Sequence, residues 1–334
     1  MKVTKRIMSY FSIKVFFIGL SLFSAITFDL GAETKYPSKP IKLIVPYPPG
    51  GAADISARFI AQGMSLGLGQ SIIIDNRPGA NGMIGTDLVA KSVPDGYTLL
   101  FTASGPIVVN PVLYKKVPYD SQKDFIPVCL GTSYQYALVV PYASPIKSIS
   151  DLIEIAKQKP GALSYGSTGV GGGGHLAGEL LALMAGVEMT HVPYKGAAPA
   201  LSDLLANQLS FTFEPIVTAV PMIKANKLRG FAVSGIKRSK AITNLATLDE
   251  LGYSGFNVTQ FQGLLAPAGT DPEIIKKLNT EMVKVLKSPQ AIQRLVEEGG
   301  NEIIASTPAE FVLRIQSDLN QYTKLITDAH IHAE

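Results

Sequence analysis

The sequence predicts an α/β protein built of two lobes. Its 334 residues are more than one ordinary hydrophobic core serves, which favours two lobes. From Ile41 to Ser234, continuous apolar segments alternate with segments of helical spacing. Such strands are typical of largely parallel sheets that helices cover on both faces. From Asp271 onward, helical patterns follow one another directly, which predicts a helical C-terminal tail.

The composition describes a globular chain and excludes several classes of protein. Hydrophobic residues make up 46% of the sequence and charged residues 17%, unlike a disordered chain. Cys129 is the single cysteine, so neither an internal disulfide nor a cysteine-rich metal site is expected. The formal net charge of +4 falls to about +1 without residues 1–32, which hold four basic residues and one acid. No basic stripe then remains to bind nucleic acid.

Residues 1–32 resemble an export signal peptide. Three basic residues stand among the first six, Val15–Phe28 is nearly all apolar, and Ala32 could precede the cleavage site. The alternative is a retained membrane anchor, but Lys14 leaves the apolar stretch short of the roughly 20 residues that a spanning helix needs. We therefore expect an exported, periplasmic protein.

Apolar segments predict the strands, and segments of helical spacing predict the helices between them. The predicted strands are Ile41–Tyr47, Ser71–Asn76, Tyr97–Ala103, Tyr136–Pro141, Leu163–Gly166, Met189–Pro193, Leu209–Phe213 and Leu228–Ser234. The predicted helices are Asp54–Leu66, Met83–Ser92, Ser148–Gln158, Gly173–Met184, Ala197–Asn207, Ala219–Ala225, Asp271–Lys287, Pro289–Glu298 and Pro308–Ala329. Ligands of parallel α/β sheets bind outside the carboxyl ends of the strands, so three loops at strand ends are candidates for a site.

The first of these loops is the corner formed by Pro48, Pro49, Gly50 and Gly51. The prolines fix their own φ and lack backbone donors, whereas the glycines carry no Cβ that could block a ligand. The N–H groups of Gly50, Gly51, Ala52 and Ala53 are expected to be free at the following helix start, and together with the positive end of the helix dipole they predict an anion site. Asp54 is expected to bond back to the corner and brace it, because its charge would repel an anion. The alternative is a tight turn with no ligand.

The other two loops are Thr102–Asn110 and the glycine loop, Gly166–Gly174. The glycine loop fits the pattern G-x-G-x-x-G between a strand and a helix. A dinucleotide fold would place an acid at the end of the next strand, but Tyr194 and Lys195 stand there, so no nucleotide cofactor is expected. The glycine loop then predicts either a second helix start rich in free donors or a flexible loop with no partner.

No residue pattern predicts catalysis or a metal site. His175 begins a helix and His191 lies in a strand, and without metal-type spacing a structural role is expected for both. The sequence contains no G-x-S-x-G, Walker A or H-E-x-x-H motif. Glu214 ends a strand, so it could face a cleft or lie on the surface. We predict neither an enzyme nor a bound cofactor.

Five segments together resemble the Bug-type extracytoplasmic solute receptors, the substrate-binding components of tripartite tricarboxylate transporters. They are YPSKPIKLIVPYPPGGAADISAR, IDNRPGANGMIGTDLVAKSVPDGYTLL, YGSTGVGGGGHLAGELL, HVPYKGAAPALSDLL and GLLAPAGT. The resemblance implies a two-lobed, type II periplasmic-binding-protein fold that closes on a small ligand. Lobe one would comprise residues 33–132 and 258–334, and lobe two residues 133–257.

The resemblance also implies a ligand and the residues that bind it. The ligand would be a small organic carboxylate, held mainly by backbone amides, hydroxyls and waters, and a monomeric receptor would deliver it to permease subunits in the membrane. The ligand-binding residues carried over by position are Tyr47, Pro48, Pro49, Gly50, Gly51, Thr102 and Ser104 from lobe one and Ser167, Thr168 and Gly169 from lobe two. Glu214 is a further candidate, and Asp54 and His175 would support the site structurally.

Three departures from the family pattern fall near the expected cleft, so the identity of the ligand is not carried over. Gly171–Gly174 replace more polar residues, Glu214 stands where Asp is usual, and Gln260–Gln262 stand where a tryptophan is common. Two other functions stay open. One is a receptor that signals to a membrane sensor protein, and the other is a secreted hydrolase, which needs a nucleophile beside a base.

Overall fold

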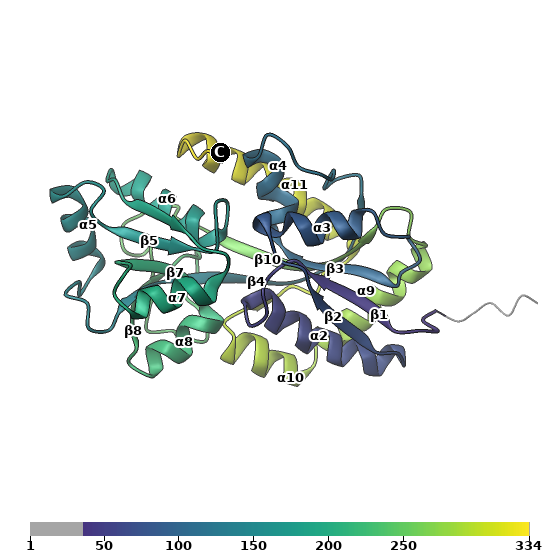
Figure 1. Cartoon of the computed structure of the whole chain (residues 1–334). Helices are drawn as coiled ribbons and strands as arrows, with labels where there is room; N and C mark the ends of the chain where they lie inside the picture. Colours follow the sequence, from purple (N-terminus) through teal and green to yellow (C-terminus); the bar gives the residue numbers. More distant parts are fainter. Residues whose placement is uncertain (1–35, 334) are drawn as a thin grey trace, which may run out of the picture. The chain divides into compact units, whose positions relative to one another are not determined.

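The described strands form one sheet, in which the long strand β4 joins one group of strands to the other (Figure 1). The computed structural model describes residues 36–333, in which Lys39 and the residues after it form a unit of their own. The strand order is β2-β1-β3-β10-β4-β7-β5-β6, with β8 and β11 also pairing with β4 and with β9 pairing with β8. The strands are β1 (Ile41–Val45), β2 (Ile72–Asn76), β3 (Thr98–Ala103), β4 (Phe125–Pro141), β5 (Ser164–Ser167), β6 (Thr190–Pro193), β7 (Phe211–Pro215), β8 (Leu228–Val233), β9 (Ala246–Thr247), β10 (Thr259–Pro267) and β11 (Glu302–Ile303).

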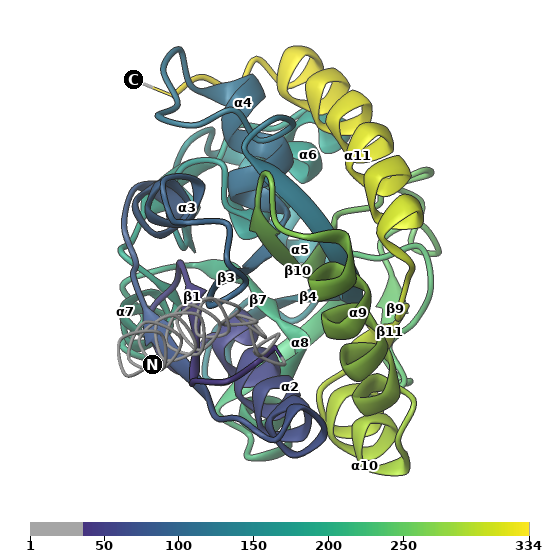
Figure 2. The same ribbon diagram turned by 90° about the vertical axis from the view of Figure 1, so that its right-hand side faces the viewer.

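Helices follow most of the strands, as the alternating sequence pattern predicts. Figure 2 shows α11 running beside the sheet, and α11 contacts β4. Shorter helical segments of other geometry cover Ala80–Gly82, Gly105–Val109 and Ile292–Glu298. The α-helices are α2 (Ala52–Leu68), α3 (Met83–Ala90), α4 (Asn110–Leu113), α5 (Ile149–Gln158), α6 (Gly173–Ala185), α7 (Ala197–Leu205), α8 (Ile216–Lys224), α9 (Pro272–Leu286), α10 (Pro289–Ala291) and α11 (Pro308–Asp328).

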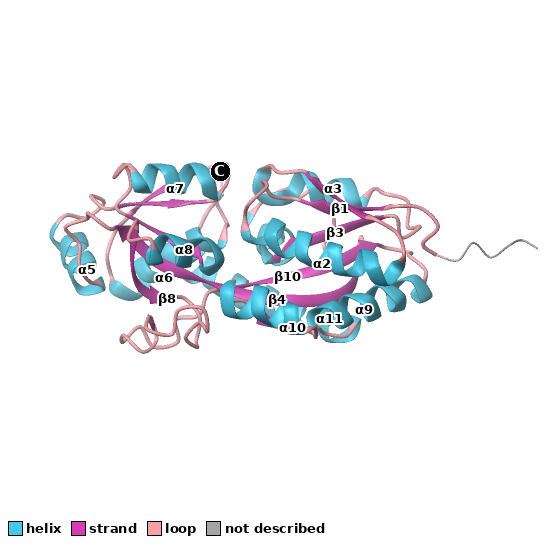
Figure 3. Ribbon diagram, turned by 90° about the horizontal axis from the view of Figure 1, so that it is seen from below, coloured by secondary structure: helices cyan, strands magenta, loops and turns pink. Residues whose placement is uncertain are grey.

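Strand β4 changes its partners along its length (Figure 3). From Phe125 to Gln135 it pairs with β10, and from Tyr136 onward it pairs with β7 and β8. The change occurs close to the boundary between residues 132 and 133 that the sequence predicts for the two lobes. The division into lobes stays a prediction.

The sheet is mixed, whereas the sequence predicts mostly parallel pairing. The pairs β1–β2, β1–β3, β5–β6 and β5–β7 are parallel. The pairs that β4 and β10 make with each other, with β3 and with β7 are antiparallel. The sequence analysis missed β10 and the first part of β4 because polar residues interrupt their apolar runs. Gln260 and Gln262 of β10 are nevertheless buried.

Among the described residues, no helix has both the length and the apolar character to cross a bilayer. The predicted signal peptide, residues 1–32, lies outside the described residues.

Candidate functional site

The corner lies between β1 and the start of α2. The N-cap of α2 is Gly51, which offers no side-chain hydrogen bond to the helix. The N–H of Gly50 donates to Oδ2 of Asp54 at 2.9 Å, so it is not one of the free donors that the sequence analysis expects. Within the described chain, the N–H groups of Gly51, Ala52 and Ala53 have no acceptor. The corner therefore presents three free donors, in the first turn of a helix.

Asp54 ties the corner to two neighbouring segments. Its carboxylate accepts hydrogen bonds at 2.9 Å from the Gly50 N–H, from Nε of Arg58 and from Nδ2 of Asn76. Asn76 also donates to the carbonyl of Tyr47 at 3.0 Å, which holds the end of β1 against the end of β2. Burial alone would raise the pKa of Asp54, but the hydrogen bonds from Arg58, Gly50 and Asn76 outweigh it and lower that pKa.

The glycine loop leads into a second helix start without a side-chain cap. Helix α6 begins at Gly173, and its N-cap Gly172 makes no side-chain hydrogen bond. A Cβ on Gly173 would collide with the hydroxyl of Tyr136, and one on Gly174 would lie 2.9 Å from the carbonyl oxygen of Phe213. These close approaches explain the departure at Gly171–Gly174, because side chains there would push α6 away from β4 and β7.

The hydroxyl of Ser167 is fully engaged inside the glycine loop. It donates to the carbonyl of Gly169 at 3.0 Å and accepts from the Gly169 N–H at 3.1 Å. Its oxygen also lies 2.6 Å from Nε2 of His191. Thr168 is exposed beside it. Ser167 therefore shapes the glycine loop. Its predicted role in ligand binding stays a prediction.

Two stacked histidines support the glycine loop. Nδ1 of His175 accepts from the Gly171 N–H at 3.1 Å, and the rings of His175 and His191 lie 4.0 Å apart. Burial lowers the pKa of His175 to about 3, with a further contribution from His191. Burial also lowers the pKa of His191 to about 4. Both rings are thus neutral at pH 7, as the bond from Gly171 to His175 requires.

The pair formed by Ser167 and His191 meets one requirement of the hydrolase alternative, a hydroxyl beside an imidazole. The other requirements fail. A general base needs a pKa near the working pH, whereas burial holds that of His191 near 4. Among the described residues no carboxylate is hydrogen-bonded to the His191 ring, and the ring packs between Tyr165 and His175. The arrangement is structural.

The predicted loop Thr102–Asn110 is helical from Gly105 onward, which corrects the sequence analysis. Thr102 and Ser104 are both fully buried. Oγ of Ser104 accepts from the N–H of Phe261 at 2.9 Å, which joins the end of β3 to β10. Oγ1 of Thr102 donates to the carbonyl of Ala103 at 3.3 Å, and Thr102 partly offsets the rise that burial causes in the pKa of Tyr47. Both hydroxyls are therefore engaged within the chain.

A tyrosine cluster, formed by Tyr47, Tyr134 and Tyr136, lies between the corner and the glycine loop. The hydroxyls of Tyr134 and Tyr136 are 3.3 Å apart, and the Tyr136 hydroxyl touches Gly173 at the start of α6. On the other side, Tyr134 contributes to the rise in the pKa of Tyr47, which burial mainly causes. The sequence analysis missed Tyr134 and Tyr136. The sequence could have indicated them, because two residues spaced by two in a strand lie on the same face of the sheet.

Two contacts join the corner side of the site to the glycine-loop side. The hydroxyl of Tyr114, just after α4, donates to the carbonyl of Val170 in the glycine loop at 3.1 Å. A Cβ on Gly196, the N-cap of α7, would lie 3.0 Å from the Pro48 ring. Gly196 is a further residue that the sequence analysis missed. The sequence could have indicated Gly196 as a site residue, because it lies between a predicted strand and a predicted helix.

Glu214 is buried, with 3% of its surface exposed, so it is not a surface glutamate. It lies in β7 next to Ala137 of β4, and its Oε1 is 2.5 Å from the hydroxyl of Thr218. Burial raises the pKa of Glu214 to about 7, although the contact with Thr218 lowers it in part. Glu214 in turn adds to the rise in the pKa of Tyr134 to about 12, which burial mainly causes.

The third departure from the family pattern, at Gln260–Gln262, consists of residues that contribute to packing. Nε2 of Gln260 donates to the hydroxyl of Tyr322 at 3.0 Å, and the ring of Phe261 packs edge-on against Phe311 at 5.2 Å. Both partners belong to α11. Oε1 of Gln262 accepts from the hydroxyl of Thr132 at 2.8 Å. These residues hold β10 between α11 and β4.

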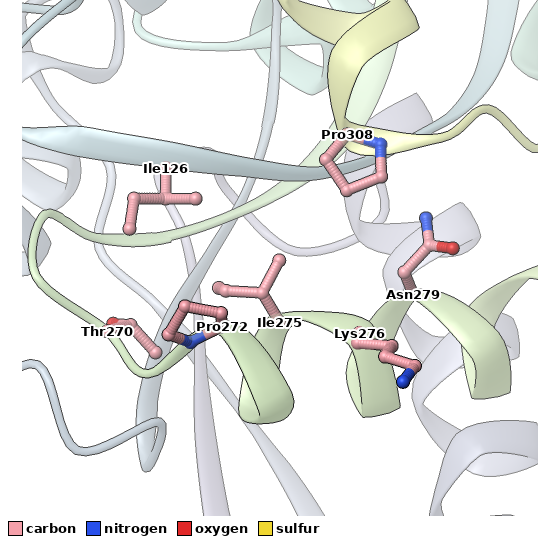
Figure 4. Close-up of a pocket in the computed structure, with 7 residues that line it drawn as sticks. All are labelled: Ile126, Thr270, Pro272, Ile275, Lys276, Asn279 and Pro308. Atoms are coloured by element: carbon pink, nitrogen blue, oxygen red, sulfur yellow. The ribbon is translucent and has the colours of Figure 1, made fainter.

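A cavity of about 310 Å³ lies away from all of these residues, between the starts of α9 and α11 (Figure 4). Here both helix starts are capped, α9 by the side chain of Asp271 and α11 by a capping box of Thr307 and Glu310. Capped starts offer fewer free donors to an anion than the uncapped starts of α2 and α6. No group of side chains in the described chain could hold a metal ion. The cavity is lined by Ile126, Thr270, Pro272, Ile275, Lys276, Asn279 and Pro308.

Comparison with known proteins identifies relatives over almost the whole described chain. The family profile described as "Tripartite tricarboxylate transporter family receptor" matches residues 56–331. Protein BugT of Bordetella pertussis is 35% identical over 291 residues, which cover 86% of this chain and 89% of BugT.

Solved structures match over a similar length. The periplasmic binding protein BugD superposes with a TM-score of 0.84 at 31% identity, covering 90% of this chain and 100% of BugD. The R. palustris protein Rpa4515, solved with adipate, gives 0.86 at 35% identity and covers 89% of this chain and 99% of its own. MatC from Rhodopseudomonas palustris, solved with bound malate, gives 0.82 at 29% identity, covering 87% and 100%. These matches confirm the expected α/β periplasmic-binding-protein fold.

Proposed function

We propose that this chain, which belongs to the tripartite tricarboxylate transporter receptor family, captures a small organic carboxylate and delivers it to permease subunits in the membrane. The family membership confirms the resemblance seen in the five sequence segments. It also confirms the expectation of a periplasmic solute-binding protein that is not an enzyme. Export by a signal peptide at residues 1–32 is part of the proposal.

The observation that carries the proposal is the pair of uncapped helix starts on either side of the tyrosine cluster. The start of α2 offers the free N–H groups of Gly51, Ala52 and Ala53. The start of α6 follows the glycine loop, and Gly172 gives it no side-chain cap. Each start combines free donors with the positive end of a helix dipole, an arrangement that binds a carboxylate without an arginine.

The relatives support a carboxylate as the ligand. Of the similar structures, one is solved with adipate and another with bound malate. We propose that the ligand lies between the corner and the glycine loop, and that the contacts of Tyr114 with Val170 and of Pro48 with Gly196 close over it. Exposed Thr168 completes the site on the glycine-loop side, whereas the N–H of Gly169, a predicted ligand-binding residue, already donates to Ser167.

Isothermal titration calorimetry against a panel of solutes tests the proposal. The panel contains acetate, malate, adipate and citrate, with glucose and putrescine as neutral and cationic controls. We expect at least one carboxylate to bind with micromolar or tighter affinity, and neither control to bind. Binding of glucose or putrescine with no carboxylate binding would overturn the proposal. A thermal-shift screen of the same panel gives a second readout, because a ligand at 100 times its Kd stabilises the folded state by about 2.7 kcal/mol.

A further inference from the structure

Glu214 is a buried carboxyl group, and among the described residues the side chain hydrogen-bonded to it is the uncharged hydroxyl of Thr218. Oγ1 of Thr218 lies 2.5 Å from Oε1 of Glu214 and 2.9 Å from the carbonyl oxygen of Pro215. A hydroxyl carries one proton and cannot donate fully to both oxygens. The Thr218 hydroxyl is thus a single, uncharged donor that Glu214 shares with the carbonyl of Pro215, and it stabilises an ionised Glu214 only in part.

The surroundings of Glu214 contain no cation that would stabilise its charge. The elements that contact β7 are β4, β5, α6, α7 and α8. Within the described chain, no ion pair or hydrogen bond joins Glu214 to a lysine, an arginine or a histidine. The titratable side chains on these elements near β7 are Tyr134 and Tyr136 of β4, Tyr165 of β5, His175 and Glu179 of α6, Asp203 of α7 and Lys224 at the end of α8.

Most of these groups have other partners. Tyr165 is bonded to Glu179, and His175 lies 3.7 Å from the same carboxylate. The hydroxyl of Tyr194 donates to Asp203 at 2.6 Å. Tyr134 is the group whose pKa Glu214 perturbs. An unpaired buried carboxylate is costly, so such a group neutralises instead. The raised pKa of Glu214, about 7, agrees with this expectation.

Glu214 is also connected to the start of α6, where the proposed ligand binds. It is the next residue after Phe213, whose carbonyl oxygen contacts Gly174 in the first turn of α6. It perturbs Tyr134, whose hydroxyl is 3.3 Å from that of Tyr136, and the Tyr136 hydroxyl touches Gly173. Tyr134 and Tyr136 thus connect Glu214 to the α6 start, so the charge of a carboxylate bound there would act on Glu214.

We propose that Glu214 is held as an uncharged carboxylic acid when the carboxylate ligand is bound, so that the receptor takes up a proton together with its ligand. This inference rests on the proposed function and deepens it. A second negative charge beside an ionised Glu214 would be repelled, and the approach of that charge favours the protonated acid. The ligand is thus bound with a proton as a co-ligand.

The inference sets the direction of the pH dependence. Below the pH at which free Glu214 ionises, affinity for the carboxylate is constant, because the acid is already protonated. Above that pH, affinity falls by up to tenfold per pH unit, because each binding event must first bring in a proton. A ligand with a cationic group beside Glu214 would reverse the sign, because it would favour the ionised form.

Two measurements on the purified chain test the inference. In the first, ¹³C NMR of chains labelled at the glutamate carboxyl carbons follows the titration without any ligand, and the signal that Glu214→Gln removes belongs to Glu214. We expect this signal to titrate near neutral pH. Titration at the ordinary value of an exposed glutamate would overturn the inference.

In the second measurement, calorimetric titration with adipate, malate and citrate is repeated between pH 6 and 9 in buffers of different ionisation enthalpy. We expect uptake of up to one proton per carboxylate bound and an affinity that falls above pH 7. In Glu214→Gln, which keeps the shape and a hydrogen-bond donor, both effects should vanish while the carboxylate still binds. Asp318→Asn is the matched control, because Asp318 is equally buried, with 3% exposed, and should leave proton uptake unchanged.

The outcomes separate the inference from the proposed function. A carboxylate that binds with no proton uptake, or with proton release, overturns the inference and leaves the proposed function standing. Equal proton uptake in Glu214→Gln and in the unchanged chain also overturns it. If none of the carboxylates binds at any pH, the proposed function fails, and the NMR titration still decides the protonation state of Glu214.

Discussion

The backbone N–H of Gly50 donates a hydrogen bond of 2.9 Å to the carboxylate of Asp54, four residues further along the chain. The bond connects the corner to the first turn of α2 and fixes the direction in which the remaining N–H groups point. It also occupies one backbone donor and places a negative charge behind the corner. Arg58 and Asn76 also donate to the carboxylate, and the positive charge of Arg58 balances that of Asp54.

Replacing Asp54 should destabilise both the fold and the ligand site. In Asp54→Asn, at least one of the three donors to this buried carboxylate loses its acceptor, so the free energy of unfolding should fall by about 2–3 kcal/mol. Urea unfolding measures this change, and calorimetry should show weaker carboxylate binding in the variant. Asp328→Asn removes an exposed pair with Lys324, also spaced by four residues, and should cost about 0.5 kcal/mol or less. Equal effects of the two substitutions would contradict the bracing role of Asp54.

The same substitution should change the response to acid. The pKa of Asp54 is lowered in the folded chain, so its contribution to stability is complete above the pKa of the unfolded state, near 4. The contribution is lost as the pH falls through the folded-state pKa. Urea midpoints measured from pH 5 down to pH 2 should therefore decline less steeply in Asp54→Asn than in the unchanged chain. Parallel curves would show that Asp54 titrates normally.

Replacing Gly50 by valine should abolish most ligand binding while the fold survives. Gly50 has a φ of +81°, which a β-branched residue adopts only with strain, and its Cβ would point into space free of protein atoms. We expect the side chain to stand where the ligand must approach and to weaken carboxylate binding at least tenfold. Gly69, at the other end of α2, has a φ of +70° and equally open surroundings, so Gly69→Val applies comparable strain away from the corner. Wild-type affinity in Gly50→Val would show that the corner is only a turn.

Removing the hydroxyl of Tyr114 should weaken ligand binding more than it weakens the fold. In Tyr114→Phe the bond to the carbonyl of Val170 is lost, which connects the segment after α4 to the glycine loop. One neutral hydrogen bond contributes about 1 kcal/mol, so we expect Kd to rise roughly fivefold. Tyr119→Phe removes a bond of 2.8 Å to Pro106 within one side of the site, and should lower the melting temperature without changing Kd. An unchanged Kd in Tyr114→Phe would contradict a closing role for this contact.

The stacked histidines should make the fold sensitive to mild acid. Burial lowers the pKa of His175 to about 3 and that of His191 to about 4, both below the unfolded value near 6.5. The unfolded chain therefore binds more protons, and stability falls as the pH drops below about 6.5, by up to about 1.4 kcal/mol per pH unit for each histidine. In His191→Phe the free energy of unfolding should therefore fall less steeply between pH 6 and pH 5, because one of the two histidines no longer takes up a proton on unfolding. A slope unchanged from the parent chain would mean that His191 titrates normally.

The local chemistry of the sequence determined the alternation of strands and helices and the starts of α2 and α6. Continuous apolar runs predicted β1, β2 and β3 to within two residues, because a short apolar run between turn residues is typical of a strand. The prolines and glycines at residues 48–51 and the glycines at 171–174 marked uncapped helix starts, because these residues have no side chain that could accept a hydrogen bond from the first turn of the helix. These features depend on neighbours in the chain, so they can be read from it.

Only the tertiary structure decided which residues complete the site. Tyr134 and Tyr136 join it because β4 runs from one group of strands to the other, and no local pattern predicts that path. His175 and His191 stack because α6 and β6 meet, although 16 positions separate them in the chain. Glu214 is buried without a cation because five elements close around β7. Burial and charge pairing depend on residues that are distant in the sequence, and these contacts set the pKa values on which the chemistry of the site depends.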